Sequence, residues 1–563
     1  MIYHCEDHTC NYWDEGEKLP ERCPQCGRKL LRANEADMTG DDWTALGNTL
    51  SDAEASDKKR MVDCFRKAAY LGSAWGVCNL GICMEQGNGV EADPVQAFWL
   101  YQQAVEMGSL NAVCCLGVCY QYGIGTAPDA KQAAELYCKA AEYGSPRGQM
   151  LLARAFHDGI GVEADAAEAV HWVRAAAYQR YGEGMHRLGE CYAYGDGVEQ
   201  NWEHAVHWFR EAAESGVSEA MTDLGYCYEK GCGVEQSWEQ AFSWYRRGAE
   251  CGDPVSMCNL GLCYKMGHGV EQNWQEAIKW YEQGAQCGDL QSMNNLAYCY
   301  ERGEGVEQNE DRALYWYRRG AEAGSVHCMF CLGWNYSNGV GVKQNMTEAI
   351  RWYTAAAEGG NADAMHNLGW HYDYGEGVEQ DMKKAIYWYE RAAEQNRPAA
   401  MNSLGECYAM GRGVPRDLET AMEWYRRAAE LGEAMADYNM GWHLEQAGKL
   451  SEAYAHYRKA ADGNDDSAWW ALGRFYENGV VVAQDGKEAR RCYETGEKLG
   501  SVKCKMRLAR CKLLGIGGRR EKKAGLDLCR QALELAKESS EKEDYGYEAE
   551  MNLLRRTIAE NES

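Results

Sequence analysis

The chain has 563 residues, of which 86 are acidic and 59 are basic, so its formal net charge at pH 7 is −27. A net negative charge of this size disfavours binding to a phosphate backbone, so we expect no nucleic-acid partner for the repeat array described below. No stretch approaches the ~18 consecutive apolar residues of a membrane span and the charged N-terminus is unlike a secretion leader, so the sequence predicts a cytoplasmic protein without a membrane partner.

Two pairs of cysteines stand out in residues 1–33. Cys5 and Cys10 form the first pair, and Cys23 and Cys26 form the second within the motif Cys-Pro-Gln-Cys-Gly. Four thiolates in a segment too short for its own hydrophobic core are typical of a tetrahedral metal site. The segment resembles a zinc ribbon or a rubredoxin-like pair of knuckles. The resemblance implies one structural zinc ion with no open coordination position.

The first cysteine pair departs from that pattern. Four residues separate its two cysteines where two are usual, and His8 lies between them. His8 is therefore an alternative ligand to Cys5 or Cys10. Zinc is expected ahead of iron, and four unbound thiols are the other reading of the segment.

A two-residue anchor then recurs every 36 positions, beginning at Leu80-Gly81. The later anchors are Leu116-Gly117, Leu152-Ala153, Leu188-Gly189, Leu224-Gly225, Leu260-Gly261, Leu296-Ala297, Leu332-Gly333, Leu368-Gly369, Leu404-Gly405 and Met440-Gly441. A fixed period of this length indicates one supersecondary unit that is copied and stacked.

The copy at 182–216 illustrates the unit. Apolar residues from Met185 to Tyr192 follow the spacing i, i+3, i+4, i+7, which predicts a first helix. Gly195 and Gly197 form a Gly-x-Gly that predicts the end of this helix, because glycine accepts the positive φ of a C-cap and a tight turn. A nucleotide-binding loop would need a strand before it, so the turn interpretation is favoured.

A second helix is predicted to begin at a residue whose side chain can cap it. These capping positions are Asp93, Asp129, Asp165, Asn201, Ser237, Asn273, Asn309, Asn345, Asp381 and Asp417. Tryptophans recur further along this helix, most of them followed by Tyr or Phe: Trp172, Trp208, Trp244, Trp280, Trp316, Trp352, Trp388 and Trp424. Because they keep the period, we expect them to form core between copies and not a cofactor site.

Many of the 26 cysteines also keep the period. Eight lie two residues after the anchor glycine or its equivalent: Cys83, Cys119, Cys191, Cys227, Cys263, Cys299, Cys407 and Cys511. We expect them to fill one small buried slot as free thiols, since cysteine is a good small core residue and a cytoplasmic protein is kept reduced.

Together these residues spell A-x-x-x-L-G-x-x-Y-x-x-G-x-G-V, a capping Asp or Asn, and A-x-x-W-Y-x-x-A-A-x-x-G. This pattern resembles the Sel-1-like repeat, a relative of the tetratricopeptide repeat. The resemblance covers 41–538 and implies an all-α solenoid, a right-handed superhelix of about thirteen to fourteen repeats. Segment 539–563 is predicted to be a capping helix.

Three copies depart from the family pattern, around Gly47, Gly441 and Gly473. The first has no Gly-x-Gly and is expected to be an N-terminal cap. The second has a shortened turn, so its next anchor follows after 32 residues, and the third carries Val481 in place of the second turn glycine. The last two departures leave the curvature near Gly441 open.

The resemblance also implies a function. In tetratricopeptide-like stacks the exposed face of the first helix lines a concave groove, so we expect a scaffold or adaptor that binds a protein or peptide there. The predicted partner-binding residues are Tyr226, Tyr298, Phe330, Trp334, His366, Trp370, Tyr374, Tyr438 and Trp442, with Lys230, Lys265 and Arg302 among them. The alternative is that several of them only complete packing between repeats.

The sequence leaves two other functions open. The zinc ribbon can be the recognition module, with the array as a spacer. Because some Sel-1-like proteins are linked to β-lactams, a β-lactamase-like hydrolase is the other. The Ser-x-x-Lys at Ser56–Lys59 has neither a Ser-Asp-Asn nor a Lys-Thr-Gly to accompany it. We therefore assign no catalytic residues, expect no enzyme and infer no small-molecule substrate.

Overall fold

The computed structural model describes residues 2–5, 13–15, 30–32, 38–50, 55–542 and 548–562. The chain divides into two compact units, Met1–Ser292 and Met293–Ser563. Each unit is described by itself below.

Three short strands stand at the start of the first unit: β1 (Ile2–Cys5), β2 (Trp13–Glu15) and β3 (Leu30–Arg32). They form an antiparallel sheet in the order β2-β1-β3. The register places Cys5, the last residue of β1, opposite Leu30, the first residue of β3. The other predicted metal ligands, Cys10, Cys23, Cys26 and the alternative His8, lie outside the described residues.

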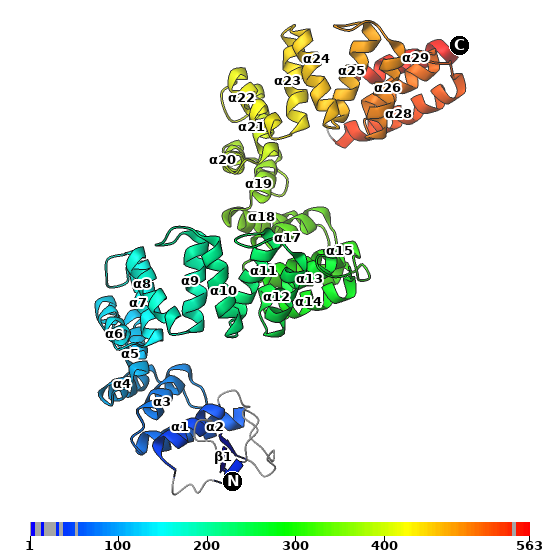
Figure 1. Ribbon diagram of the computed structural model, residues 1–563. Helices are drawn as coiled ribbons and strands as arrows, with labels where there is room; N and C mark the ends of the chain where they lie inside the picture. The colour runs from blue at the N-terminus through cyan, green and yellow to red at the C-terminus, as the bar shows by residue number, and fades with distance from the viewer. Residues whose placement is uncertain are drawn as a thin grey trace. The chain divides into compact units, whose positions relative to one another are not determined.

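The rest of the first unit is helical, and successive helices pack against each other as antiparallel pairs (Figure 1). The helices are α1 (Gly40–Thr49), α2 (Ala55–Tyr70), α3 (Ala74–Gln86), α4 (Pro94–Glu106), α5 (Leu110–Tyr122), α6 (Ala130–Glu142), α7 (Pro146–Asp158), α8 (Ala166–Tyr178), α9 (Gly182–Tyr194), α10 (Trp202–Glu214), α11 (Ser218–Lys230), α12 (Trp238–Glu250), α13 (Pro254–Met266) and α14 (Trp274–Gln286). Helix α15 (Leu290–Arg302) spans the division between the units.

The second unit continues the same pattern to the C-terminus. Its helices are α16 (Glu310–Glu322), α17 (Val326–Asn338), α18 (Met346–Glu358), α19 (Ala362–Tyr374), α20 (Met382–Glu394), α21 (Pro398–Met410), α22 (Leu418–Glu430), α23 (Ala434–Gln446), α24 (Leu450–Asp462), α25 (Asp466–Asn478), α26 (Gly486–Lys498), α27 (Val502–Leu514), α28 (Lys522–Lys542) and α29 (Glu548–Glu562). The protein is therefore an array of paired α-helices, as expected from the period.

The copy formed by α9 and α10 explains why each unit folds as it does. Helix α9 ends at Gly195, whose φ of 76° is left-handed and whose amide donates to the carbonyl of Cys191 at 2.9 Å. Helix α10 begins after Asn201, whose side chain accepts from the amide of His204 at 3.0 Å. All ten predicted capping residues accept such a bond.

The second turn glycine has a different role from the first. A Cβ added at Gly197 would lie 2.2 Å from the carbonyl oxygen of Ala166, the first residue of α8 in the preceding copy. The missing side chain therefore lets the turn of one copy press against the second helix of the copy before it.

The core is organised around one aromatic ring per copy, on the second helix. The rings are Phe65, Tyr101, Tyr137, Phe209, Tyr245, Tyr281, Tyr317, Tyr353, Tyr389, Tyr425, Tyr457 and Tyr493, and all are buried. In most copies the ring lies over the anchor glycine of the first helix. We call this position the ring position; Val173 occupies it in the copy of α7 and α8.

The predicted tryptophan core is corrected in one respect. Each tryptophan directly precedes the ring position, and apart from the buried Trp316 the series is only half-buried. Trp244 and Trp424 carry arginine guanidinium groups over their rings, at 4.3 and 4.4 Å from the centroids. The tryptophans thus cover the seam between copies, and the tyrosine that follows fills the interior.

The periodic cysteines are all buried, as predicted. All cysteines from Cys64 to Cys529 are free thiols. Burial raises the pKa of the Cys227 and Cys263 thiols to about 12. They are small core residues.

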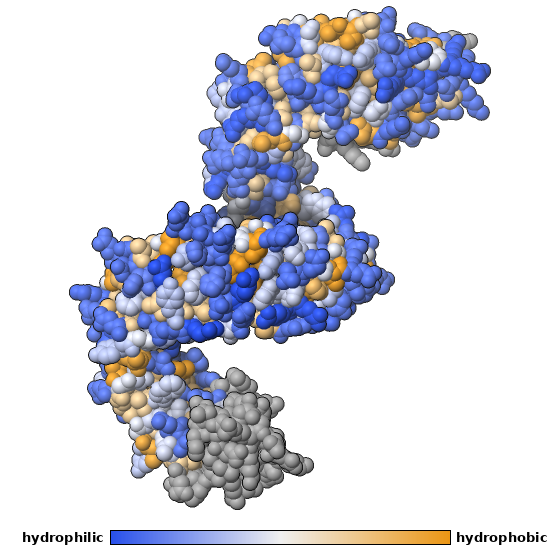
Figure 2. Space-filling model, viewed as in Figure 1, coloured by the Kyte–Doolittle hydropathy of each residue, from blue (hydrophilic) through white to orange (hydrophobic). Residues whose placement is uncertain are grey.

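Hydrophilic residues predominate on the face of the molecule in Figure 2, with small separate hydrophobic areas among them. Within the described part of the chain, no helix combines the length and the apolar character that crossing a bilayer requires.

Candidate protein-binding surface

The position directly after the anchor is one of the positions at which the first helices expose apolar side chains. From Tyr226 onward it is occupied by Tyr226, Leu262, Tyr298, Trp334, Trp370, Glu406 and Trp442. The exposed fractions are 45% for Tyr226, 37% for Leu262, 38% for Tyr298, 42% for Trp334 and 38% for Trp442. The sequence prediction names aromatic residues only and therefore omits Leu262, which occupies the same register position.

Four of the nine predicted partner-binding residues are partly buried: Phe330, His366, Trp370 and Tyr438. Phe330 and Tyr438 pack against the hydrophobic core, with ring centroids 6.0 Å from Tyr353 and 5.6 Å from Tyr457 respectively. Both residues lie three positions before the anchor glycine, where the side chain turns toward the ring position. Phe330 and Tyr438 therefore pack against the core, in agreement with the alternative that some of the predicted residues complete packing between repeats.

In the second unit, Trp334 on α17, Trp370 and Tyr374 on α19, and Trp442 on α23 form what we call the aromatic face. The rings of Trp370 and Tyr374 lie one helical turn apart with centroids at 5.0 Å. Tyr374 is the most exposed of the four, at 54%. Three of the four are at the same repeat position, so the helices present them on equivalent sides.

A cavity of about 330 Å³ opens on this face beside α19 and α21. Its lining includes His366, Trp370 and Tyr374, all predicted from the sequence, together with Met435 and Glu433. Aromatic rings beside polar groups that can fix the orientation of a ligand are common in binding pockets.

The wall of this cavity contains a network of charges. Asp373 is almost fully buried, and its carboxylate accepts from Arg412 at 2.9 Å and from the hydroxyl of Tyr389 at 3.4 Å. Burial raises the pKa of Asp373, and Arg412 opposes that shift. Glu406 accepts from Asn402 and Asn439, at 3.1 and 3.4 Å. The network holds the cavity wall in place.

His366 is a neutral member of the cavity wall. Burial, together with the nearby positive charge of Arg397, lowers its pKa to about 4. Its Nε2 lies 3.4 Å from the hydroxyl of Ser403 on α21. The imidazole therefore joins α19 to α21 as an uncharged hydrogen-bonding group at neutral pH.

The predicted cations accompany aromatic rings. The ammonium of Lys230 lies 5.9 Å from the centroid of Tyr226, and the guanidinium of Arg302 lies 5.7 Å from that of Tyr298. Lys265 instead lies 5.3 Å from the ring of Trp274, at the first position of the second helix. The similarly placed Trp238 stacks on His268 with centroids at 3.9 Å. Trp274 thus contacts the first helix of its own copy, whereas Trp238 contacts the turn of the next copy.

One cluster in the first unit has metal-ligand chemistry. Ligand atoms of His186, Glu190 and Asp223 lie within 4.8 Å of one another. However, His186 Nε2 is 2.6 Å from Asp223, and Arg187 lies 3.2 Å from Glu190, so these charges already have partners in the protein. We assign no metal there.

A profile of the Sel1 repeat matches thirteen segments of the chain between residues 76 and 537. Among solved structures, a protective antigen of uropathogenic Escherichia coli displaying an SLR fold is 29% identical, with 76% of this chain and 94% of that one covered and a TM-score of 0.56. A Sel1 repeat protein from Oxalobacter formigenes is 33% identical, with 44% of this chain and 98% of that one covered and a TM-score of 0.40. No curated protein matches.

Proposed function

The chain belongs to the Sel1 repeat family, and on this premise we propose that it is a scaffold that binds a protein or peptide rather than an enzyme. Repeat scaffolds of this kind typically bind other proteins, and they do so over an extended surface that requires no single deep catalytic site.

The aromatic face is the observation that carries the proposal. Trp334, Tyr374 and Trp442 expose large rings to water, and the partly buried Trp370 lies beside Tyr374, on helices that pack against the core. Exposed aromatics at a polar-rimmed cavity are typical of interaction hot spots, since a partner that covers them removes apolar surface from water. An extended peptide that crosses α17, α19, α21 and α23 would contact all four.

Selection from a phage-displayed random peptide library on the full chain tests this proposal. Peptides enriched on the wild-type protein should lose at least roughly tenfold in affinity for the double variant Trp334→Ala/Trp442→Ala. The matched control is Tyr315→Ala/Tyr387→Ala, because these tyrosines are 52% and 48% exposed but lie on the second helices α16 and α20. Equal loss in both double variants, or no loss in either, would refute the aromatic face.

We also propose that the N-terminal segment holds one structural zinc ion through Cys5, Cys10, Cys23 and Cys26. The strand register supports this, because Cys5 pairs with Leu30 and Cys26 precedes Leu30 by only four residues. Purified protein should contain about one zinc per chain, and Cys23→Ser/Cys26→Ser should remove it, whereas Cys251→Ser, an exposed cysteine of the array, should not. Unchanged metal content in the double variant would rule the site out.

The same peptides decide whether the N-terminal segment is instead the recognition module. If it is, Cys23→Ser/Cys26→Ser abolishes their binding and the tryptophan variant does not. Under our proposal the reverse pattern is expected.

A further inference from the structure

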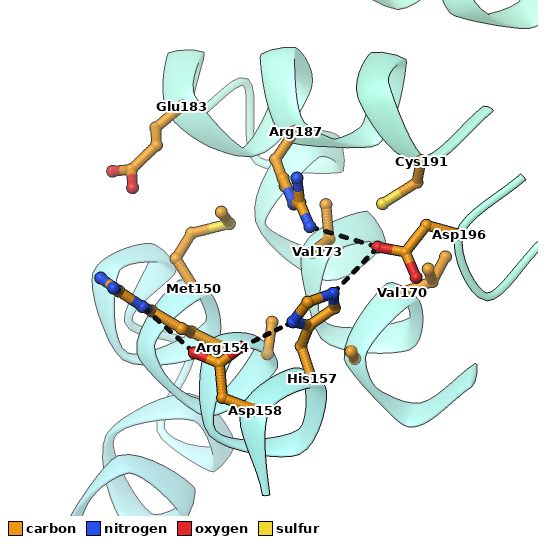
Figure 3. A pocket seen from close by; sticks show the side chains of 12 residues that line it. Met150, Arg154, His157, Asp158, Val170, Val173, Glu183, Arg187, Cys191 and Asp196 are labelled. Carbon is orange, nitrogen blue, oxygen red and sulfur yellow. Dashed lines mark hydrogen bonds and ion pairs between the residues drawn. The ribbon is translucent and has the colours of Figure 1, made fainter. Parts of the chain in front are cut away.

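A cavity of about 340 Å³ opens between α7, α8 and α9 in the first unit (Figure 3). Val173 forms part of its wall. From Phe65 to Tyr493, Val173 is the residue that breaks the series of aromatic rings at the ring position. The cavity therefore lies in the copy whose ring is missing.

The other copies show what this space normally contains. The ring of Tyr101 lies over Gly81, and its hydroxyl donates to Glu85 at 2.6 Å, with Cys78 and Cys115 as its electrostatic neighbours. Two periods further along the chain, these positions are occupied by Ala153, His157, Met150 and Arg187, respectively. All four line the cavity. The cavity is thus the space of a tyrosine ring.

Hydrogen bonds and ion pairs link the side chains along the rim of the cavity (Figure 3). His157 Nδ1 lies 2.7 Å from Asp158, and His157 Nε2 lies 3.3 Å from Asp196. Arg154 and Arg187 close the two ends of the chain, at 3.5 Å from Asp158 and 3.2 Å from Asp196. Met150, Val170 and Val173 form an apolar wall behind these groups.

The charges around the cavity favour a neutral occupant. Two arginines face three carboxylates, those of Asp158, Glu183 and Asp196. Each arginine already has a carboxylate partner, so an incoming phosphate would find no unpaired arginine and would lie near three carboxylates. An uncharged ring meets neither obstacle, and it can lie beside the guanidinium groups.

We propose that this cavity receives the side chain of an unphosphorylated tyrosine from a bound protein or peptide, which takes the place of the ring that the copy lacks. The proposal rests on the function proposed above in that the partner is a polypeptide. The site itself is separate from the aromatic face, because its lining residues lie between Met150 and Asp196.

The other copies indicate where the hydroxyl of the bound tyrosine would lie. In other copies it donates to the residue sixteen positions earlier, as Tyr245 does to Glu229 at 2.9 Å and Tyr493 to Glu477 at 2.7 Å. The corresponding residue here is His157, whose Nε2 faces Asp196. The carboxylate of Asp196 has acceptor sites beyond its bonds to Arg187 and His157, so it can accept from a phenol.

Side-chain analogues test the cavity without any partner. The full chain, labelled with ¹³C at the methionine methyl groups, is titrated with p-cresol, and the Met150 resonance is followed. We expect a saturable shift in the wild-type protein and in Glu168→Tyr, which adds a tyrosine at an exposed position of α8. Val173→Tyr fills the cavity from within and should abolish the shift. No saturable shift, or a shift that persists in Val173→Tyr, would overturn the proposal.

Folding of the filled variant has support within the chain. Ala297 lies at the anchor position opposite the buried Tyr317, so an alanine there is compatible with a tyrosine ring. Ala153→Gly/Val173→Tyr is the second variant, since it restores the glycine and tyrosine combination of the other copies. It should be at least as stable as the wild-type protein and equally unable to bind p-cresol.

The hydroxyl is tested by comparing p-cresol with toluene. The wild-type protein should bind p-cresol more tightly by about fivefold, the ratio expected of one hydrogen bond. Asp196→Ala should reduce this preference to near unity. An unchanged preference would contradict the assignment to tyrosine.

Peptide selection tests the polypeptide source. Random peptides selected on the wild-type protein should be enriched in tyrosine relative to peptides selected on Val173→Tyr. No difference between the two selections would overturn the partner part of the proposal. The analogue titration involves no partner, and the aromatic-face variant lies in the other unit, so failure of this proposal and failure of the proposed function are distinguishable.

Discussion

The ring of Tyr245 lies over the anchor glycine Gly225, so closely that a Cβ added at Gly225 would be 2.5 Å from Cε1 of the ring. The hydroxyl of the same ring donates to Glu229 at 2.9 Å, one helical turn beyond that glycine. Ring, glycine and acceptor thus form one packing unit within the copy. This unit explains why the anchor is so regular: the glycine makes room for the ring that fills the interior.

Gly225→Ala tests this packing unit. In a helix interior, alanine is ordinarily more stabilising than glycine. Here the added methyl group meets the ring of Tyr245, and overpacking of this kind costs about 1–3 kcal/mol. Urea denaturation should show a loss of stability. In Gly225→Ala/Tyr245→Val, which imitates the Ala153 and Val173 combination, the loss should be smaller than the sum of the two single losses. Additive losses would mean that the two residues do not interact.

Acid should destabilise the second unit through His366. Its pKa is about 4 in the folded protein against an ordinary 6.5, so the unfolded chain binds more protons between these values, and stability falls as the pH falls through that window. His366→Gln removes this contribution. As the pH is lowered from 7.5 to 4.5, the free energy of unfolding of the variant should rise by about 2–3 kcal/mol relative to that of the wild-type protein. Parallel stability curves for the two proteins across that range would contradict the lowered pKa.

Val481 should be a site of backbone strain. It occupies the second turn glycine position with a φ of 64°, a left-handed conformation that costs a side-chain-bearing residue about 1–2 kcal/mol. Val481→Gly should therefore stabilise the protein by about 1 kcal/mol, after the greater unfolded-state entropy of glycine is deducted. The control Val482→Gly should be destabilising, because Val482 packs against the core and is not left-handed. Thermal unfolding of both variants provides the comparison.

Thiol reactivity should follow position in the repeat. Cys251 and Cys287 are exposed at the ends of α12 and α14, whereas Cys227 and Cys263 are buried with pKa values raised to about 12. Brief treatment with iodoacetamide at pH 8 should alkylate the exposed pair faster, by a factor on the order of a hundred or more. Mass spectrometry of peptides would measure the rates, and in denaturant the four rates should converge. Similar rates in the folded protein would contradict the burial of the periodic thiols.

The period alone predicted the paired helices, the glycine turns, the ten capping residues and the buried cysteines. These features depend on a few residues near one another in the chain, so each copy carries its own evidence. The aromatic residues were a harder case. Tyr226 and Trp334 are exposed as predicted, while Phe330 and Tyr438 pack against the core. Exposure depends on side chains that arrive from the neighbouring helices, which the spacing of one helix does not contain.

The fold of this protein follows from local sequence, because propensity, capping and periodicity all act within one copy. Which equivalent positions are filled and which are open depends instead on how the helices of neighbouring copies pack together. In the sequence, Val173 is an ordinary apolar residue. It is distinctive only in the structure, where the neighbouring copies hold an aromatic ring in the space that α7, α8 and α9 leave as a cavity. A missing volume is a property of the packed neighbours together, and no single residue encodes it.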